Sequence, residues 1–170
     1  MKKMFVLMVL CWALSACEKE LGRVIEGVNE FGGKTIEYLE PVNTRMSKKV
    51  EFSDNTGRIR IVERYLLPDA AQNLGFEKQI TKYNTEGTLI EDLRLSPEGL
   101  NNEWGYLSYQ KFFSDKNRLT NALIQYKPSK AREQGFWSSA VLYDEKGKIS
   151  KITYFDDQKN VISPSVKPAP

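Results

Sequence analysis

The sequence lacks histidine entirely and contains only two cysteines, Cys11 and Cys17, among its 170 residues. The absence of histidine excludes a serine or cysteine nucleophile activated by histidine, and it excludes histidine-ligated zinc. Beyond Cys17 the chain has no thiol, so cysteine catalysis, thiolate metal sites and disulfide bonds are excluded there. The side chains left for catalysis are carboxylates, lysine, tyrosine and serine.

An excess of charge of one sign is also missing. The chain has 25 Lys and Arg residues against 22 Asp and Glu residues, which gives a formal net charge of +3, and Lys2 and Lys3 supply part of that excess. A nucleic-acid surface normally shows a basic face, and steering of a strongly charged ligand needs a large field of one sign. We therefore expect no nucleic-acid partner.

Long apolar runs are absent apart from one near the start of the chain. Met4 to Leu14 (MFVLMVLCWAL) is uninterrupted by polar residues and follows Lys2 and Lys3. It is shorter than the stretch of about 20 residues that spans a hydrocarbon core. A basic start, a short apolar run and small residues at its end are typical of a secretory signal peptide.

The residues after this run, Leu14-Ser15-Ala16-Cys17, resemble the lipobox of bacterial lipoproteins. The resemblance implies cleavage between Ala16 and Cys17, a diacylglyceryl thioether on Cys17, and a further fatty acid such as palmitate on the new amino group. Two or more acyl chains anchor a protein stably in a membrane. The alternative is an ordinary secretory signal peptide with cysteine at its cleavage site.

The residue after the predicted lipidated cysteine bears on location. By resemblance to the enterobacterial sorting rules, aspartate at this position retains a lipoprotein in the inner membrane, whereas this chain has Glu18. We expect residues 1–16 to be the signal peptide and residues 17–34 to be a lipidated tether or short helix. The expected location is the outer membrane, facing the periplasm.

A repeat of about 30 residues follows. Each unit opens with glycine and an aromatic residue, has a second aromatic ring eight residues after that glycine, and continues through Gly or Asn to an aliphatic residue. These elements are Gly75-Phe76, Tyr83, Gly87 and Leu89; Gly105-Tyr106, Phe113, Asn117 and Leu119; and Gly135-Phe136, Tyr143, Gly147 and Ile149.

Each unit predicts a β-hairpin. Aromatic and β-branched residues precede turns that read SDNTG, NTEG, SDKN and DEKG, in which Gly or Asn suits a left-handed backbone. Pro68, Pro97 and Pro128 mark strand ends, because proline cannot donate to a ladder. The prediction is an all-β antiparallel meander of about four hairpin repeats over residues 35–162. Apolar residues on both sides of some strands suggest that the meander bends over itself, or that its second face is covered.

The stretch from Tyr143 to Asp156 (YDEKGKISKITYFD) is similar to the YD repeat, and more loosely to MORN-like hairpin repeats. The matching positions are Tyr143-Asp144, Gly147, Ile149 and Tyr154. The resemblance implies a structural or binding array and names no chemistry.

Two alternatives remain for the N-terminal segment. Leu21, Val24, Ile25 and Val28 have helical spacing within Glu18 to Asn29, and Gly32-Gly33 would end such a helix. The other interpretation is a tether followed by a first hairpin from Thr35–Leu39 to Val50–Phe52. At the other end, residues 163–170 are proline-rich and are expected to be disordered.

The candidate binding residues are aromatic. Repeating rings can stack on sugars or line a groove for an extended peptide, and the alternative is cross-strand packing. We expect no catalytic residue, cofactor or metal. Asp156-Asp157 with Asn160 lacks the ligand spacing of a calcium loop. Glu91, Asp92 and Glu145 could supply the paired carboxylates of a glycoside hydrolase, but Glu91 and Asp92 are neighbours on a strand and point to opposite faces, so they cannot form that pair unaided, and solvated strand residues are the expected interpretation. The candidate aromatics are Trp104, Tyr106, Tyr109, Trp137, Tyr143 and Tyr154.

Together these features predict a lipid-anchored envelope protein that acts as a non-catalytic binding or scaffolding module. Its expected partners are the membrane, through the lipid, and an envelope protein or a glycan. Two alternatives are an immunity or antitoxin lipoprotein that neutralises a toxin, and a carboxylate-dependent envelope hydrolase.

Overall fold

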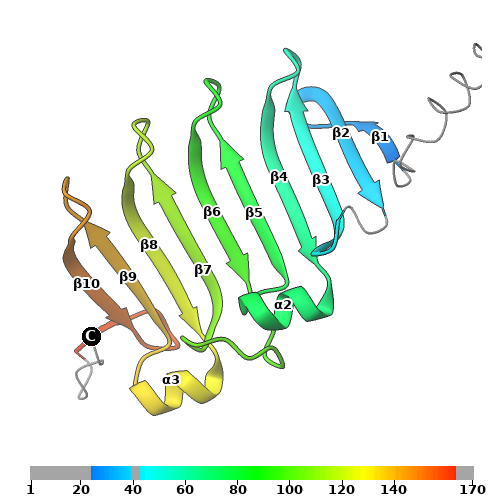
Figure 1. The fold of residues 1–170 in the computed structure, drawn as a ribbon. Coiled ribbons are helices and arrows are strands. Elements are labelled where there is room, and N and C mark those ends of the chain that lie inside the picture. The colour runs from blue at the N-terminus through cyan, green and yellow to red at the C-terminus, as the bar shows by residue number, and fades with distance from the viewer. Residues whose placement is uncertain (1–23, 40–42, 164–170) are drawn as a thin grey trace, which may run out of the picture.

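The computed structural model describes residues 24–39 and 43–163, which form one open antiparallel sheet (Figure 1). The order of its 11 strands follows the sequence, so each strand pairs with its neighbours along the chain. The predicted all-β antiparallel meander is confirmed, but the count of about four repeats is not. The strands are β1 (Val24–Val28), β2 (Gly32–Leu39), β3 (Met46–Asp54), β4 (Ile59–Leu66), β5 (Lys78–Tyr83), β6 (Leu89–Leu95), β7 (Tyr106–Phe113), β8 (Leu119–Tyr126), β9 (Ser138–Tyr143), β10 (Ile149–Phe155) and β11 (Val161–Ile162).

The helical interpretation of the N-terminal segment is wrong where the structure describes it. β1 is extended and pairs with β2, with Val24 opposite Tyr38. β-branched residues favour the extended backbone, and pairing with β2 satisfies the polar groups along one edge of β1. The alternative hairpin is confirmed, because β2 pairs with β3 and Thr35 lies opposite Phe52. Residues 18–23, the lipobox with Ala16 and Cys17, and the tail from residue 164 lie outside the described residues.

The tight turns that join β3 to β4, β5 to β6, β7 to β8 and β9 to β10 lie at one end of the strands and share one construction (Figure 1). In the β3–β4 turn the Asp54 carbonyl accepts the Gly57 N–H at 2.9 Å, and Asp54 Oδ1 accepts the N–H groups of Thr56 and Arg58 at 2.9 and 3.1 Å. The residue that closes the turn is left-handed, with φ 82° at Gly57 and 55° at Asn117. Glycine and asparagine tolerate this backbone best, which is why the turns were visible in the sequence.

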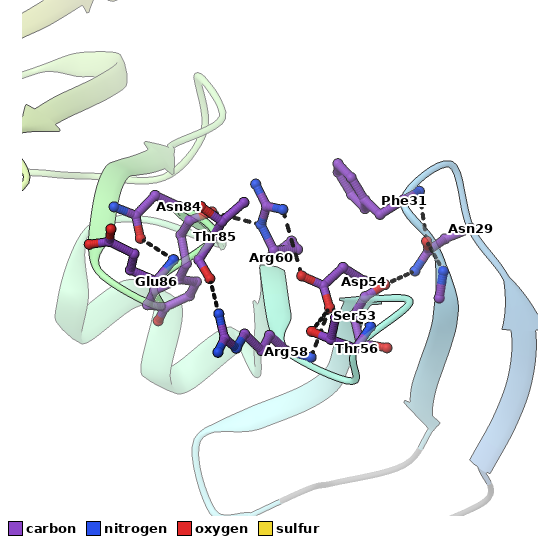
Figure 2. A network of polar contacts seen from close by, with 12 residues as sticks. Asn29, Phe31, Ser53, Asp54, Thr56, Arg58, Arg60, Asn84, Thr85 and Glu86 are labelled. Atoms are coloured by element: carbon purple, nitrogen blue, oxygen red, sulfur yellow. Dashed lines mark hydrogen bonds and ion pairs between the residues drawn. The ribbon is translucent and has the colours of Figure 1, made fainter.

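Neighbouring turns are tied to one another by arginine (Figure 2). Arg58 Nη1 donates to the Thr85 carbonyl at 2.6 Å, and Arg60 Nε donates to the Tyr83 carbonyl at 3.2 Å. Arg118 makes the equivalent contact with the Glu145 carbonyl at 3.4 Å. These hydrogen bonds hold the turns of successive hairpins side by side at that end of the strands.

Two short helices, α2 (Pro68–Leu74) and α3 (Pro128–Gln134), lie at the opposite end of the strands (Figure 1). The sequence correctly placed strand ends near these prolines, but the hairpin repeat did not predict helices there. Each has proline in its first turn and a left-handed glycine after its end, Gly75 or Gly135, which is the common pattern for short helices. The unit that contains a helix therefore spans 60 residues, twice the predicted period.

Between β6 and β7 a loop occupies the position that a helix takes in the flanking units. It contains Gly99, and glycine disfavours a helix by about 1 kcal/mol relative to alanine. The loop runs from Ser96 to Gly105 and carries Trp104.

The strand register defines two faces. We name the first the Tyr109 face, since one row of directly opposed residues on it passes through Tyr109. The side chains of the alternate strand residues point to the second face, which we name the Leu123 face. The row through Tyr109 is Tyr38, Lys49, Arg64, Gln79, Arg94, Tyr109, Ile124, Ser139 and Tyr154. The row through Leu123 is Glu37, Val50, Glu63, Ile80, Leu93, Gln110, Leu123, Ala140 and Thr153.

The main buried cluster lies on the Tyr109 face and consists of Tyr106, Tyr109, Ala122 and Val141. The extensive strand contacts run between sequence neighbours, so the sheet does not bend over itself within residues 24–39 and 43–163. The Leu123 face carries ion pairs on its central strands, such as Lys78–Glu63 at 2.8 Å between β5 and β4. Nearer to β10 it carries exposed apolar residues, such as Leu123 on β8. No helix in the described part of the chain is long and apolar enough to cross a membrane.

Candidate binding site

A hollow of about 350 Å³ opens on the Tyr109 face, between the end of α2 and the loop that carries Trp104. We name it the Trp104 hollow. Its floor comes from β6 and β7, and its rim comes from α2 and the loop. The lining residues are Gln72, Asn73, Leu74, Gly75, Arg94, Asn101, Asn102, Glu103, Trp104, Tyr106, Tyr109 and Lys111.

The structure brings three of the predicted aromatics together here. The ring centroids of Trp104 and Tyr109 are 5.6 Å apart, and those of Tyr106 and Tyr109 are 5.9 Å apart, both with tilted planes. Tyr143 packs against the same cluster. Tyr106 and Tyr109 are buried, whereas Trp104 is 51% exposed. Trp104 therefore exposes its indole to solvent while packing against Tyr109, which in turn packs against Tyr106.

The remaining two predicted aromatics lie elsewhere. Tyr154 packs on Phe136 with ring centroids 4.6 Å apart, which is core packing beside α3. Trp137 lines a separate hollow of about 600 Å³ with Leu123, Ser138 and Phe155, whose strand positions belong to the Leu123 face. The six rings therefore do not form one continuous surface.

Hydrogen bonds fix the loop that carries Trp104. Asn102 Nδ2 donates to Ser96 Oγ at 2.8 Å and to the Tyr106 carbonyl at 2.9 Å, while Asn102 Oδ1 accepts the Tyr106 N–H at 3.0 Å. The buried Lys127 ammonium donates to the carbonyls of Glu98, at 3.2 Å, and Leu100. Burial lowers the pKa of Lys127. The loop is thus held in one half by the partly buried Asn102 and in the other by the buried Lys127.

Two cations lie in the floor of the hollow. The Arg94 guanidinium lies 5.1 Å from the Phe76 ring centroid, and its Nε is 3.5 Å from Asp92 Oδ2. Lys111 Nζ lies 4.9 Å from the Tyr109 ring centroid. Burial, with a further contribution from the Arg94 charge, lowers the pKa of Lys111. Burial, with Tyr143 adding to it, raises the pKa of Tyr109 to about 12, so this phenol is neutral at physiological pH.

Sequence reasoning missed both Arg94 and Lys111. The register that the structure shows puts Arg94 opposite Tyr109 and Lys111 opposite Asp92. No pattern within a single strand marks these two residues, because their place in the hollow follows from pairing between strands.

The carboxylates weighed as catalytic residues are separated, as predicted. Glu91 lies opposite Phe112 on the Leu123 face, and Asp92 lies opposite Lys111 on the Tyr109 face. Glu91 pairs with Lys82 at 3.0 Å, and Asp92 Oδ1 accepts from Gln79 Nε2 at 2.7 Å. Both carboxylates are therefore engaged in cross-strand contacts.

The acidic stretch near the C-terminus closes a turn. Asp156 Oδ1 accepts the N–H groups of Gln158 and Asn160 at 2.9 and 2.7 Å, and Oδ2 accepts Asn160 Nδ2 at 3.0 Å. These hydrogen bonds, led by the Asn160 side chain, lower the pKa of Asp156. Across the described residues, no group of three or more His, Cys, Asp or Glu side chains is placed to hold a metal ion.

A scan against known protein families gave no match, and a search of curated proteins found no significant relative. The function is therefore inferred from the chain's own residues and their geometry.

Proposed function

We propose that this protein is a non-catalytic binding module of the bacterial cell envelope, and that its ligand occupies the Trp104 hollow. The observation that carries the proposal is the half-exposed Trp104 indole on a loop fixed by hydrogen bonds from Asn102 and Lys127. An indole that is about half exposed gives up much of the burial energy a core tryptophan supplies. Its fixed orientation over Tyr109 is what a ligand that stacks on it requires.

The absence of catalysis in this proposal is supported by the chemistry of the hollow. The Tyr109 phenol in the hollow has a raised pKa, and Asp92, the buried carboxylate beside Arg94, is hydrogen-bonded to Gln79. General acid–base catalysis works best with a group whose pKa lies near the operating pH. The sequence has no histidine to supply one.

The envelope location rests on Leu14-Ser15-Ala16-Cys17 alone. Lipidation of Cys17 would tether the sheet to the membrane, and Glu18 favours the outer membrane. Replacing Cys17 with serine removes the acylated sulfur, so Cys17→Ser should abolish incorporation of labelled fatty acid. Continued labelling of that variant would refute the anchor and leave the binding proposal to be tested separately.

The binding proposal is tested by crosslinking the full lipidated chain in its own envelope and identifying captured proteins and glycans by mass spectrometry. Trp104→Ala should lose a component that the unsubstituted chain captures. Trp137→Ala is the matched control, because it removes the same side chain from the hollow on the Leu123 face. Equal capture by the two variants, with both shown to be folded by circular dichroism, would contradict the proposal.

A further inference from the structure

The floor of the Trp104 hollow holds two cations on adjacent strands. Arg94 on β6 lies opposite Tyr109 on β7, and Lys111 is two residues further along β7, on the same face. Diagonal neighbours of this kind are about 7–8 Å apart at Cα, within reach of one small anion held between two long side chains. Both residues line the hollow.

Packing alone does not require a charge at Arg94. Sixty residues further on, the equivalent row position is Tyr154, which packs on Phe136 as Arg94 packs on Phe76. An aromatic side chain therefore fills the same structural position in the second unit. The partly buried guanidinium in the first unit costs some desolvation that tyrosine does not, and its contacts with Phe76 and Asp92 offset part of this cost, so packing by itself does not explain why this position carries a charge.

Beneath the floor of the hollow, these two cations share one carboxylate, Asp92. Asp92 is the carboxylate that faces both cations, and one of its oxygens is occupied by Gln79. Arg94 Nε is buried and has no hydrogen bond, with Asp92 3.5 Å away. Within the described residues, Lys111 has no ion pair closer than 4 Å, and its ammonium lies 4.9 Å from the Tyr109 ring centroid. Glu103 lies on the exposed rim.

An anion in the hollow would supply the missing partner. The desolvation of Lys111 already depresses its pKa, so a bound negative charge would stabilise the ammonium form. Salt bridges to partly desolvated cations are stronger than those at an open surface. The small net charge of the whole chain does not oppose this, since the effect depends on local charges.

The rest of the hollow specifies what carries the anion. Trp104 offers an apolar plane at the rim, and three residues with side-chain amides, Gln72, Asn73 and Asn101, line the same hollow. An aromatic plane beside planar amides suits a ring that is apolar on its face and bears hydroxyl groups on its edge. We infer that the Trp104 hollow binds an acidic sugar, a pyranose with a carboxylate, whose ring stacks on Trp104 and whose carboxylate lies between Arg94 and Lys111. This inference rests on the proposed function and names the ligand class of that same site.

The test uses the full chain in detergent, labelled with ¹⁵N at its indoles. Chemical shifts of Trp104 and Trp137 are followed while glucuronate, glucose or benzoate is added, with the resonances assigned by single Trp→Phe substitutions. Glucuronate should shift Trp104 saturably and leave Trp137 unchanged, and glucose should bind at least tenfold more weakly. Lys111→Gln should weaken glucuronate binding at least tenfold, and Lys111→Arg should retain it.

The matched control is Lys116→Gln, which removes one positive charge from the exposed β7–β8 turn and should leave binding unchanged. Equal binding of glucose and glucuronate, or full binding by Lys111→Gln, would overturn the anion site. Benzoate binding as tightly as glucuronate would overturn the sugar, and the absence of any shift would overturn the whole inference. Those results would leave the proposed function to the crosslinking comparison of Trp104→Ala and Trp137→Ala, which does not depend on the ligand's charge.

Discussion

Gly75 and Gly135 form a matched pair that tests how the loop carrying Trp104 is packed. Each ends a helix with a left-handed backbone, at φ 76° and 77°, and each donates its N–H to an alanine carbonyl, at 2.8 Å to Ala71 and 2.9 Å to Ala131. Their surroundings differ. A Cβ added at Gly135 meets nothing within 4 Å, whereas one added at Gly75 would lie 2.7 Å from Asn102 Cβ and 3.4 Å from its Cα.

The expected magnitudes follow from these contacts. A left-handed backbone costs an L-residue about 1–2 kcal/mol, and alanine returns about 0.4–1 kcal/mol by restricting the unfolded chain. Gly135→Ala should therefore reduce the free energy of unfolding by about 1 kcal/mol. Gly75→Ala bears the same cost and must also displace Asn102, and overpacking of this kind costs about 1–3 kcal/mol more.

Urea denaturation followed by circular dichroism measures the two losses, and the indole resonance of Trp104 reports on the loop. Gly75→Ala should be the less stable variant and should shift the Trp104 resonance, because Asn102 holds the loop onto Tyr106. Gly135→Ala should leave that resonance in place. Equal losses of stability, to within about 0.5 kcal/mol, would refute the packing of α2 against the loop.

Three further predictions concern the core and the titratable groups. Phe136→Ala should lower the free energy of unfolding by about 3–5 kcal/mol in urea denaturation, because Phe136 is 2% exposed between Tyr126 and Tyr154; a loss below 1 kcal/mol would contradict this packing. Burial opposes ionisation of Glu63, but hydrogen bonds from Lys78 and Tyr65 outweigh this effect and lower the pKa of Glu63. The ionised carboxylate therefore stabilises the fold above the ordinary pKa of 4.5, and this stabilisation is lost as the pH falls through the lowered pKa. Glu63→Gln should accordingly flatten the loss of stability between pH 6 and pH 3, and an unchanged acid profile would show that the pair does not act this way. The pKa of Lys111 is lowered from 10.5, so its ammonium loses its proton at a lower pH than an ordinary lysine does. Glucuronate binding should therefore weaken as the pH rises, at pH values still below 10.5, and Lys111→Arg should remove this dependence. The same pH profile in both proteins would exclude Lys111 as its cause.

The turns and the strands between them were largely readable from the sequence. Asp54, Asn84 and Asp144 with their following glycines close turns through contacts within five residues, and such local chemistry does not depend on the rest of the fold. The alternation that separates Glu91 from Asp92 is equally local, because it follows from the pleat of a single strand. The lipobox is likewise a local pattern, and its consequences remain predictions.

Tertiary structure decided which residues meet. The row through Lys49, Arg64, Gln79, Arg94 and Tyr109 advances fifteen residues per strand, and this register is set by pairing between strands. Because of this register, Arg94 and Lys111 lie beside Tyr109, whereas Trp137 lies at the hollow on the Leu123 face. The helices after Pro68 and Pro128 are too short to be stable alone, and their alanines are buried only once the sheet is present. The turns and the alternation of the strands could thus be read from the sequence, because they depend on neighbouring residues. The Trp104 hollow could not, because it forms only through the pairing of β6 with β7 and the packing of α2 beside the loop that follows β6.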